Sequence, residues 1–466
     1  MQKSIDWNYS WYKPFLFECG DIYICRVAPG KEYVHFEWKT EEGAVYSIHY
    51  RKRGDEQFIT VDGITNGEYT LSGLEDLTDY EFYVSCGDKK SIIRLARTGK
   101  AVGTVVNYLH PDDIVYDFSG RALCSPCVIR HPNGSLLASM DVFAPERPQN
   151  LCLLFRSYDD GKTWHHLTDL FPCYWPAMFI HNGELYVLGV STEYGDLLIG
   201  KSTDGGETFG APTVILRGSC SNKDLGTHKA PQNIYFKDGR LYTSCEWGSW
   251  SRGFHAASVI SCDATKDLLD ASNWSITYPV KYDSSWEGVG DFPSTGCIEG
   301  TVVEAPDGKL YNVMRYDMTQ SEEKFGKVLA YEINTNDPTA PLKFSHAINL
   351  NGNHSKFMIR RDELTGDYFS IINRLTDKNR CCDRRLVSLM RSKDLENWEL
   401  VMDLFDYRDI ALEKDVGFQY IFFFIENDTI YFQCRTALNG ARNFHDANYS
   451  TFHKIKNFRD SSPILE

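Results

Sequence analysis

Charged residues recur at one position of a repeated hairpin pattern in this sequence. Six hairpins carry a recognisable turn residue, and four of them have a charged residue seven positions after it: Asp141, Glu246, Arg315 and Arg435. Glu299 stands nine positions before the turn of the hairpin that contains Arg315. Hydrolysis of a glycosidic bond needs two carboxyl groups, one of which protonates the leaving oxygen. The pattern therefore favours an exo-acting glycoside hydrolase on a terminal, acidic sugar.

The neighbours of each carboxyl group determine the role that it can take. Arg315 and Arg435 beside Glu299 keep it ionised, so Glu299 is predicted to be a base, the partner of a nucleophile or a ligand anchor. The proton donor is then predicted to be Asp141 or Glu246, whichever is less solvated.

Residues near the same strand ends are candidates for binding a sugar. Aromatic rings stack on sugar faces, and guanidinium groups hold carboxylates. Besides Arg315 and Arg435, these candidates are Arg374, Gln419, Trp247, Trp175 and Tyr174.

Two other functions fit the same residues. A polysaccharide lyase that cleaves a uronic-acid glycoside by β-elimination needs a cation for the carboxylate and a His or Tyr base. Arg315 or Arg435 would supply the cation, and His228 or Tyr420 the base. A non-catalytic carbohydrate-binding propeller is the third possibility, in which the acidic residues are paired with no cavity between them.

The repeat that positions these residues predicts an all-β fold. Each unit has an apolar strand, a turn and a second strand, followed by a third and often a fourth strand. Six such units predict a six-bladed β-propeller over residues 104–466. Strand one of a blade begins, and strand two ends, at the central mouth. The turn residues are Gly134, Gly183, Gly239, Gly308, Gly366 and Asp428.

A second motif lies between the outer strands of two units. The segments 157–164 and 202–209 both read S-x-D-x-G-x-T-[WF], and 392–398 is a degenerate copy. This Asp box is a structural turn, because its Asp accepts backbone N–H groups and its aromatic residue packs between strands. The motif predicts the fold and places the active face at the opposite end of the blades.

These features resemble the sialidase superfamily of Asp-box (BNR-repeat) propellers over residues 104–466. The stretch from Ile298 to Arg315 is similar to the family segment in which a glutamate partners the nucleophilic tyrosine and an arginine clamps the substrate carboxylate. The resemblance implies these roles for Glu299 and Arg315, and places the tyrosine at Tyr420. The family also has an arginine in an R-I-P stretch of the first blade, where this chain has Cys124-Ser125-Pro126, so strict sialidase activity is not expected.

The first 100 residues read as a separate small domain. Short segments with β-branched and aromatic residues alternate with turns, which predicts an N-terminal β-sandwich. The stretch from Leu71 to Tyr80 resembles the corner of a fibronectin type III domain, in which a tyrosine hydrogen-bonds back across the sandwich. No catalytic group is expected in residues 1–100.

Composition and charge exclude several partners. The chain has 466 residues and a net charge of −15, so neither nucleic acid nor an anionic membrane is expected as a partner. No secretory signal is visible, which predicts a cytoplasmic protein; a signal removed from the chain would leave secretion open. The sequence does not indicate an oligomeric state.

The sequence predicts neither a cofactor nor a metal site. Cys124 and Cys127 form the one C-x-x-C pair, and no second pair completes a zinc site. His228, His445 and Asp446 lack the clustered spacing of zinc ligands. The expected partner is therefore a carbohydrate substrate alone.

Overall fold

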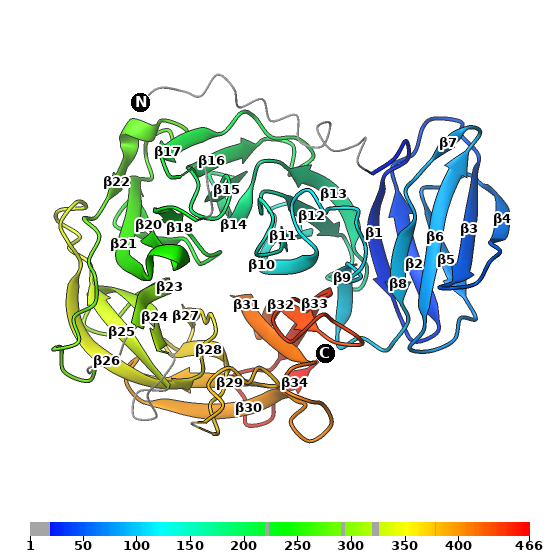
Figure 1. The fold of residues 1–466 in the computed structure, drawn as a ribbon. Coiled ribbons are helices and arrows are strands. Elements are labelled where there is room, and N and C mark those ends of the chain that lie inside the picture. Colours follow the sequence, from blue (N-terminus) through cyan, green and yellow to red (C-terminus); the bar gives the residue numbers. More distant parts are fainter. Residues whose placement is uncertain (1–18, 220–222, 290–293, 319–325, 378) are drawn as a thin grey trace.

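The computed structural model describes residues 19–219, 223–289, 294–318, 326–377 and 379–466, and this part of the chain is almost entirely β-structure. Figure 1 shows a small group of N-terminal strands beside a ring of sheets. The described residues form no α-helix, only short 3-10 turns such as η2 (Trp250–Arg252) and η3 (Ala271–Asn273). None of the described helical segments is long and apolar enough to cross a bilayer.

The N-terminal strands form two sheets. The first sheet contains β1 (Ile24–Pro29), β2 (Tyr33–Trp38) and β5 (Glu68–Ser72). The second contains β3 (Tyr46–Lys52), β4 (Ile59–Ile64), β6 (Asp79–Cys86), β7 (Lys89–Lys90) and β8 (Arg94–Arg97). The Phe36 and Phe82 rings pack between them, with centroids 4.6 Å apart. Tyr80 Oη accepts the backbone N–H of Glu75 at 3.0 Å, the hydrogen bond expected of a tyrosine corner.

The remaining strands form antiparallel groups that follow one another along the chain. The first group is β10 (Ala122–Arg130), β11 (Leu136–Phe143), β12 (Cys152–Ser157) and β13 (His165–Leu170). The second is β14 (Tyr174–His181), β15 (Glu184–Val190), β16 (Leu197–Ser202) and β17 (Thr213–Leu216). In the third, β18 (Gly226–His228) and β19 (Tyr235–Lys237) both pair with β20 (Arg240–Ser249), which is followed by β21 (Phe254–Asp263) and β22 (Trp274–Ile276).

Three more groups complete the ring, and the first of them is joined to the third group in one sheet by a single parallel pair, His255 opposite Gly296. The fourth is β23 (Ser294–Glu304), β24 (Leu310–Met318), β25 (Gly326–Glu332) and β26 (Lys343–Gly352). The fifth is β27 (Ile359–Arg361), β28 (Tyr368–Asn373), β29 (Leu386–Ser392) and β30 (Trp398–Asp406). The sixth is β31 (Gly417–Glu426), β32 (Thr429–Ala437), β33 (Tyr449–Lys456) and β34 (Ile464–Leu465). The first strand of each group lies nearest the centre of the ring in Figure 1.

The two ends of this ring are joined by one strand pair. Strand β9 (Thr104–Tyr108) precedes the first group in sequence but pairs with β33 of the last group, with Tyr108 opposite Tyr449. The segment that leaves the N-terminal sheets therefore extends the last sheet and closes the ring.

The N-terminal sheets are bonded directly to the beginning of the ring. Tyr23 Oη lies 2.8 Å from Tyr116 Oη, and Arg26 Nε donates to the carbonyl oxygen of Val106 at 2.8 Å. One hydrophobic cluster runs through the N-terminal sheets and the first and last groups without interruption. The junction is therefore a packed interface.

The two complete S-x-D-x-G-x-T motifs form turns with the same hydrogen bonds. Asp159 accepts the backbone N–H and the hydroxyl of Thr163 at 2.9 and 2.7 Å, and Asp204 binds Thr208 in the same way at 3.0 and 2.6 Å. These turns follow third strands, whose direction places them at the end of the sheets opposite the ends of the second strands. Hydrogen bonds to the ionised form, against the opposing effect of burial, lower the pKa of Asp204 to about 2.

The Gly161→Ala substitution tests how tightly the first of these turns packs. Gly161 has φ +87°, and an added Cβ would lie 2.0 Å from the buried Phe452 ring. Gly134 has nearly the same φ, +88°, but open space around it. Both alanine variants carry the left-handed backbone cost of roughly 1 kcal/mol. Gly161→Ala should lose about 1–3 kcal/mol more than Gly134→Ala in denaturant unfolding, because overpacking adds to it. Equal losses would contradict the packing.

Candidate active site

Four inner strands share a bulge that holds one residue in the left-handed region. The residues are Ser125 (φ 48°), Trp175 (φ 52°), Glu299 (φ 57°) and Tyr420 (φ 56°). Each lies where the register of its strand shifts against the second strand of the group. A bulge adds one residue and re-aims its side chain, and non-glycine residues adopt this backbone at a cost.

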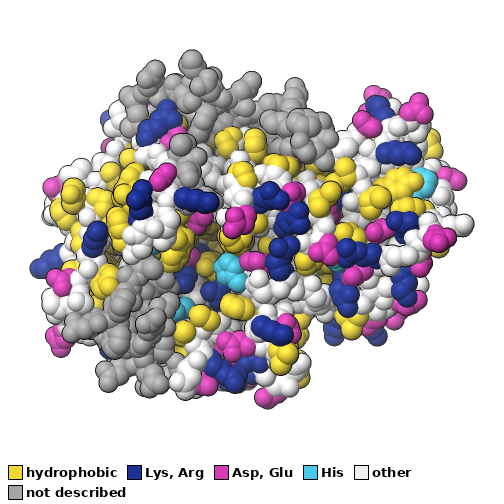
Figure 2. Space-filling view, viewed as in Figure 1, with side chains coloured by type: hydrophobic (Ala, Val, Ile, Leu, Met, Phe, Trp, Pro, Cys, Tyr) yellow, Lys and Arg dark blue, Asp and Glu magenta, His cyan; other side chains and the backbone are white. Residues whose placement is uncertain are grey.

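All four bulge residues line one cavity of about 420 Å³. Figure 2 shows a hollow near the centre of the ring, with His, Lys and Arg side chains around it. Seven of the residues singled out from the sequence line the cavity: Tyr174, Trp175, His228, Glu299, Arg315, Tyr420 and Arg435. Its volume is within the range of small-molecule sites.

Arg315 connects the two bulge residues with acid–base chemistry. Its Nη1 donates to Glu299 Oε2 at 2.7 Å and to Tyr420 Oη at 3.4 Å. Glu299 and Arg315 are 4% and 7% exposed, so the ion pair is nearly dry. Arg315 lies opposite Ile298 in the strand pairing, which brings the carboxylate and the guanidinium together across one hairpin. One cation thus holds a carboxylate and a phenol at the same point of the cavity.

Two further guanidinium groups approach the ring of Tyr420. The Cζ atoms of Arg384 and Arg435 lie 5.3 and 5.0 Å from its centroid. Arg384 Nε and Nη1 and Arg435 Nε are buried and have no hydrogen-bond partner among the described residues. Burial and the nearby cations Arg315 and Arg435 lower the pKa of Arg384. Three cations therefore crowd this part of the cavity, and two of them, Arg384 and Arg435, have unused donors.

Arg384 was missed by the sequence analysis. It lies in the connection between β28 and β29, whereas the turn-based register assigns only residues within strands. The connections vary in length from group to group, so no spacing pattern marks it.

Glu193 is a second cavity residue that the sequence analysis missed. It lies in the connection between β15 and β16 and lines the cavity. Burial raises the pKa of Glu193 to about 7, although the nearby His228 and a hydrogen bond with Gln149 oppose the shift. A carboxyl group that is half protonated at neutral pH can donate a proton to a leaving group.

Asp141 and Glu246 do not line the cavity, although they were singled out as proton donors. Asp141 is fully buried, and its Oδ2 accepts the backbone N–H of Trp175 at 2.8 Å, which holds that bulge. Glu246 Oε2 lies 2.8 Å from Nδ1 of His228, and its Oε1 accepts the Ser244 hydroxyl at 2.8 Å. Both carboxyl groups therefore support residues that line the cavity.

Three predicted binding residues also lie away from the cavity. Gln419 is buried and donates to the carbonyl oxygen of Phe444 at 2.6 Å. Trp247 lies on β20. Arg374 binds Asp403 at 2.8 Å and lines a different depression. Arg374 directly follows the end of β28, and its side chain points to the outer strands. It therefore cannot hold a substrate carboxylate in the cavity, contrary to the prediction.

Comparisons with known proteins place the fold. No protein-family model matches the sequence, and a search of the curated proteins finds no significant match. Among solved structures, the Hadza microbial sialidase Hz136 is 14% identical, covers 93% of this chain and 94% of its own, and has a TM-score of 0.51. An α-L-arabinanase of Penicillium chrysogenum complexed with arabinobiose is 15% identical, with 77% and 99% coverage and a TM-score of 0.49. A leech intramolecular trans-sialidase is 10% identical, with 94% and 92% coverage and a TM-score of 0.48.

The likeness to the first of these structures defines the class of fold. It extends over nearly the whole of both chains, so the chain has the sialidase-like β-propeller fold. The names of all three structures are those of enzymes that act on glycosidic bonds.

The Arg384→Met substitution tests whether Arg384 binds an anion in the cavity and lowers the stability of the protein when no anion is bound. A ligand that binds only the folded state raises the melting temperature. In the wild type, sodium glucuronate should therefore raise it more than glucose does, because only glucuronate has a carboxylate for the arginines. Arg384→Met should keep or raise stability without ligand, since it removes a crowded buried cation, but lose most of the glucuronate shift. Arg374→Met, which breaks the ion pair with Asp403 outside the cavity, should keep that shift. An unchanged shift in Arg384→Met would contradict the anion site.

Proposed function

We propose that this protein is a glycoside hydrolase that removes a terminal acidic sugar from a glycan or oligosaccharide. The observation that carries the proposal is the cavity in which three arginines surround a tyrosine joined to a glutamate through Arg315. The sequence resembles the sialidase superfamily, in which a glutamate partners the nucleophilic tyrosine.

The proposal includes the architecture predicted from the sequence. The six strand groups are six blades of the propeller over residues 104–466, closed by β9. Residues 1–100 form a fibronectin type III-like sandwich, which the two N-terminal sheets and the Tyr80 hydrogen bond support. The turns at Asp159 and Asp204 are then Asp boxes on the face away from the cavity.

The charge of the cavity supports an acidic substrate. A carboxylate bound by Arg384 and Arg435 would occupy donors that have no partner among the described residues. It would also relieve the repulsion among Arg315, Arg384 and Arg435, which a neutral sugar cannot do. Trp175 and Tyr174 line the same cavity; Trp175, 9% exposed, is the ring that could contact the sugar, whereas Tyr174 is 1% exposed and packs behind it.

In the proposed mechanism, Tyr420 is the nucleophile and Glu299 its base. Glu299 accepts the phenol proton while Tyr420 Oη attacks the anomeric carbon, and the Arg315 guanidinium stabilises the charge that develops on the oxygen. Glu193 gives its proton to the leaving oxygen, because it is the cavity carboxyl group that is partly protonated at neutral pH. Water then attacks the anomeric carbon of the glycosyl-tyrosine and gives its proton to Glu193, while the bond to the Tyr420 oxygen breaks and Glu299 returns the phenol proton to that oxygen.

Elimination is the second candidate reaction, and one observation favours it. His445 lines the cavity beside Tyr420, with ring centroids 6.4 Å apart. Burial and the Arg435 charge lower the pKa of His445 to about 3, which makes its imidazole neutral but weakly basic, so it is the position of the ring beside Tyr420 and Arg435 that favours this reaction. A lyase would use the same arginines to neutralise a uronate carboxylate while a base removes the adjacent proton.

Product analysis by mass spectrometry tests the proposed function. The protein should be incubated with a panel of sialosides, uronosides and rhamnosides. Hydrolysis should release a sugar, and the masses of the products should add up to the mass of the substrate plus one water. An unsaturated uronate product would instead establish the lyase, and no product from any acidic glycoside would favour a binding protein. Glu299→Gln should lower turnover about 100-fold or more and remain folded, since Gln keeps the volume and one acceptor. Near-normal turnover in that variant would remove Glu299 from the mechanism.

The Glu193→Gln substitution tests the assignment of the proton donor. The donor must be protonated, so wild-type turnover should fall as the pH rises through about 7. Glu193→Gln should lower kcat/KM, which reports the first step, about 10²–10⁴-fold with natural glycosides and much less with a 4-nitrophenyl glycoside, whose leaving group needs no proton. Glu184→Gln, which alters a surface carboxylate paired with Lys201 on the neighbouring strands, should leave turnover unchanged. Equal losses with both substrates would assign the proton to another group.

A further inference from the structure

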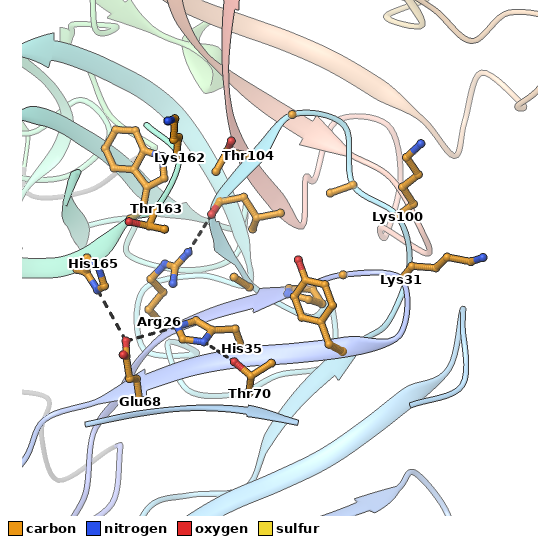
Figure 3. A pocket seen from close by; sticks show the side chains of 18 residues that line it. Arg26, Lys31, His35, Glu68, Thr70, Lys100, Thr104, Lys162, Thr163 and His165 are labelled. Atoms are coloured by element: carbon orange, nitrogen blue, oxygen red, sulfur yellow. Dashed lines mark hydrogen bonds and ion pairs between the residues drawn. The ribbon is translucent and has the colours of Figure 1, made fainter. Parts of the chain in front are cut away.

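The junction between the N-terminal sheets and the first blade contains a groove of about 840 Å³ that catalysis does not use (Figure 3). Two imidazoles and one carboxylate line one end of it, and a second, buried carboxylate lies beside them. His35 and Glu37 come from β2, Glu68 from β5 and His165 from β13. In Figure 3, His35 and His165 turn toward the carboxylate of Glu68 from opposite sides.

The ligand atoms of His35, Glu37 and Glu68 lie within 4.8 Å of one another, and an imidazole nitrogen of His165 approaches both carboxylates. His165 Nδ1 lies 3.2 Å from Glu37 Oε1 and 4.0 Å from Glu68 Oε2. His35 Nε2 lies 3.6 Å from Glu37 Oε1 and 3.9 Å from Glu68 Oε2. Zinc bonds of 2.0–2.2 Å in a tetrahedron place ligand atoms about 3.3–3.6 Å apart, so small shifts would close the first three groups around an ion. His165, which lies outside that group of three, would have to turn further toward it to become the fourth ligand.

Hydrogen bonds around the cluster orient two of the four groups. His35 Nδ1 lies 2.9 Å from the hydroxyl of Thr70, which leaves Nε2 facing the carboxylates. Glu37 Oε2 accepts the backbone N–H of His166 at 3.1 Å, which turns Oε1 toward the two imidazoles. Such outer partners fix the tautomer and direction of metal ligands.

The charges around the cluster leave it anionic enough for a divalent cation. Burial raises the pKa of Glu37, but hydrogen bonds with His165 and His35 and the charge of Arg26 lower it further, so the carboxylate stays ionised. Arg26 Nη1 shares Glu37 Oε1 at 2.9 Å and offsets one of the two negative charges. Lys31 and Lys100, which also line the groove, lie at its other end in Figure 3.

We propose that His35, Glu37, Glu68 and His165 bind one divalent transition-metal ion of the zinc type. Two imidazole nitrogens select against calcium and magnesium, which prefer oxygen ligands alone. Three ligands come from the N-terminal sheets and one from the first blade, so the ion would tie the two parts together. The ligands are dispersed in sequence, which is why ligand spacing does not reveal the site.

The test is titration of the full-length protein, stripped with EDTA, with zinc chloride. The protein should carry Cys381→Ser and Cys382→Ser, because these thiols and His354 form another cluster that can hold a metal. This background should bind one equivalent of zinc tightly and show a rise in melting temperature with it. Cobalt(II) should give the intense visible absorption of a tetrahedral site.

Single substitutions in that background identify the ligands. His165→Ala and Glu68→Gln alter partly exposed side chains and should each weaken zinc binding about 100-fold or more. Thr70→Val, which removes the partner of His35 Nδ1, should weaken it about 10-fold. His346→Ala is the matched control, since His346 also pairs with a glutamate, Glu396, but with no second imidazole in contact. Binding that is absent in the background, or equally tight in His165→Ala and Glu68→Gln, would overturn the proposal.

Discussion

The cavity of the candidate active site depends on four inner-strand residues that adopt a left-handed backbone. In a regular strand, side chains alternate between the two faces of a sheet, and neither face of an inner strand points along the axis of the ring. The bulges at Ser125, Trp175, Glu299 and Tyr420 break this alternation and turn one side chain per strand into the cavity. Each costs of order 1–3 kcal/mol, which the paired strands on either side must supply. The buried carboxylate of Asp141 helps to do so by binding the backbone of Trp175.

The three arginines Arg315, Arg384 and Arg435 also lower the stability of the folded protein. They are held by protein contacts, such as the ion pair of Arg315 with Glu299 and the bond from Arg384 Nη2 to the His354 carbonyl oxygen. These contacts do not use all the donors of Arg384 and Arg435, and the three cations repel one another. Stability and binding therefore pull in opposite directions at this point, as is common where a site is organised before its ligand arrives.

Turn spacing predicted part of this site, and side-chain length explains where it failed. Asp141, Glu246, Arg315 and Arg435 occupy equivalent places on second strands, as the common offset requires. The long arginines extend into the cavity, whereas the shorter carboxylates end against Trp175 and His228 beneath it. Arg384 and Glu193 come from connections, whose lengths follow no repeat. The all-β nature of the chain was predictable because turns and strand patterns are local signals. The contacts between distant strands at the junction were not.

Closure of the ring by β9 has a consequence for how the protein folds during its synthesis on the ribosome. The partner of Tyr108 is Tyr449, so this strand pair cannot form until nearly the whole chain has been made. Translation proceeds at about 5–20 residues per second, so the partner strand of β9 is made roughly 20–70 s after β9 itself. The N-terminal sheets can fold during that time, but the hydrophobic cluster that they share with the last blade stays open to solvent. The nascent chain thus exposes an aggregation-prone apolar surface until the last blade is made. Chaperones can bind this surface during that time.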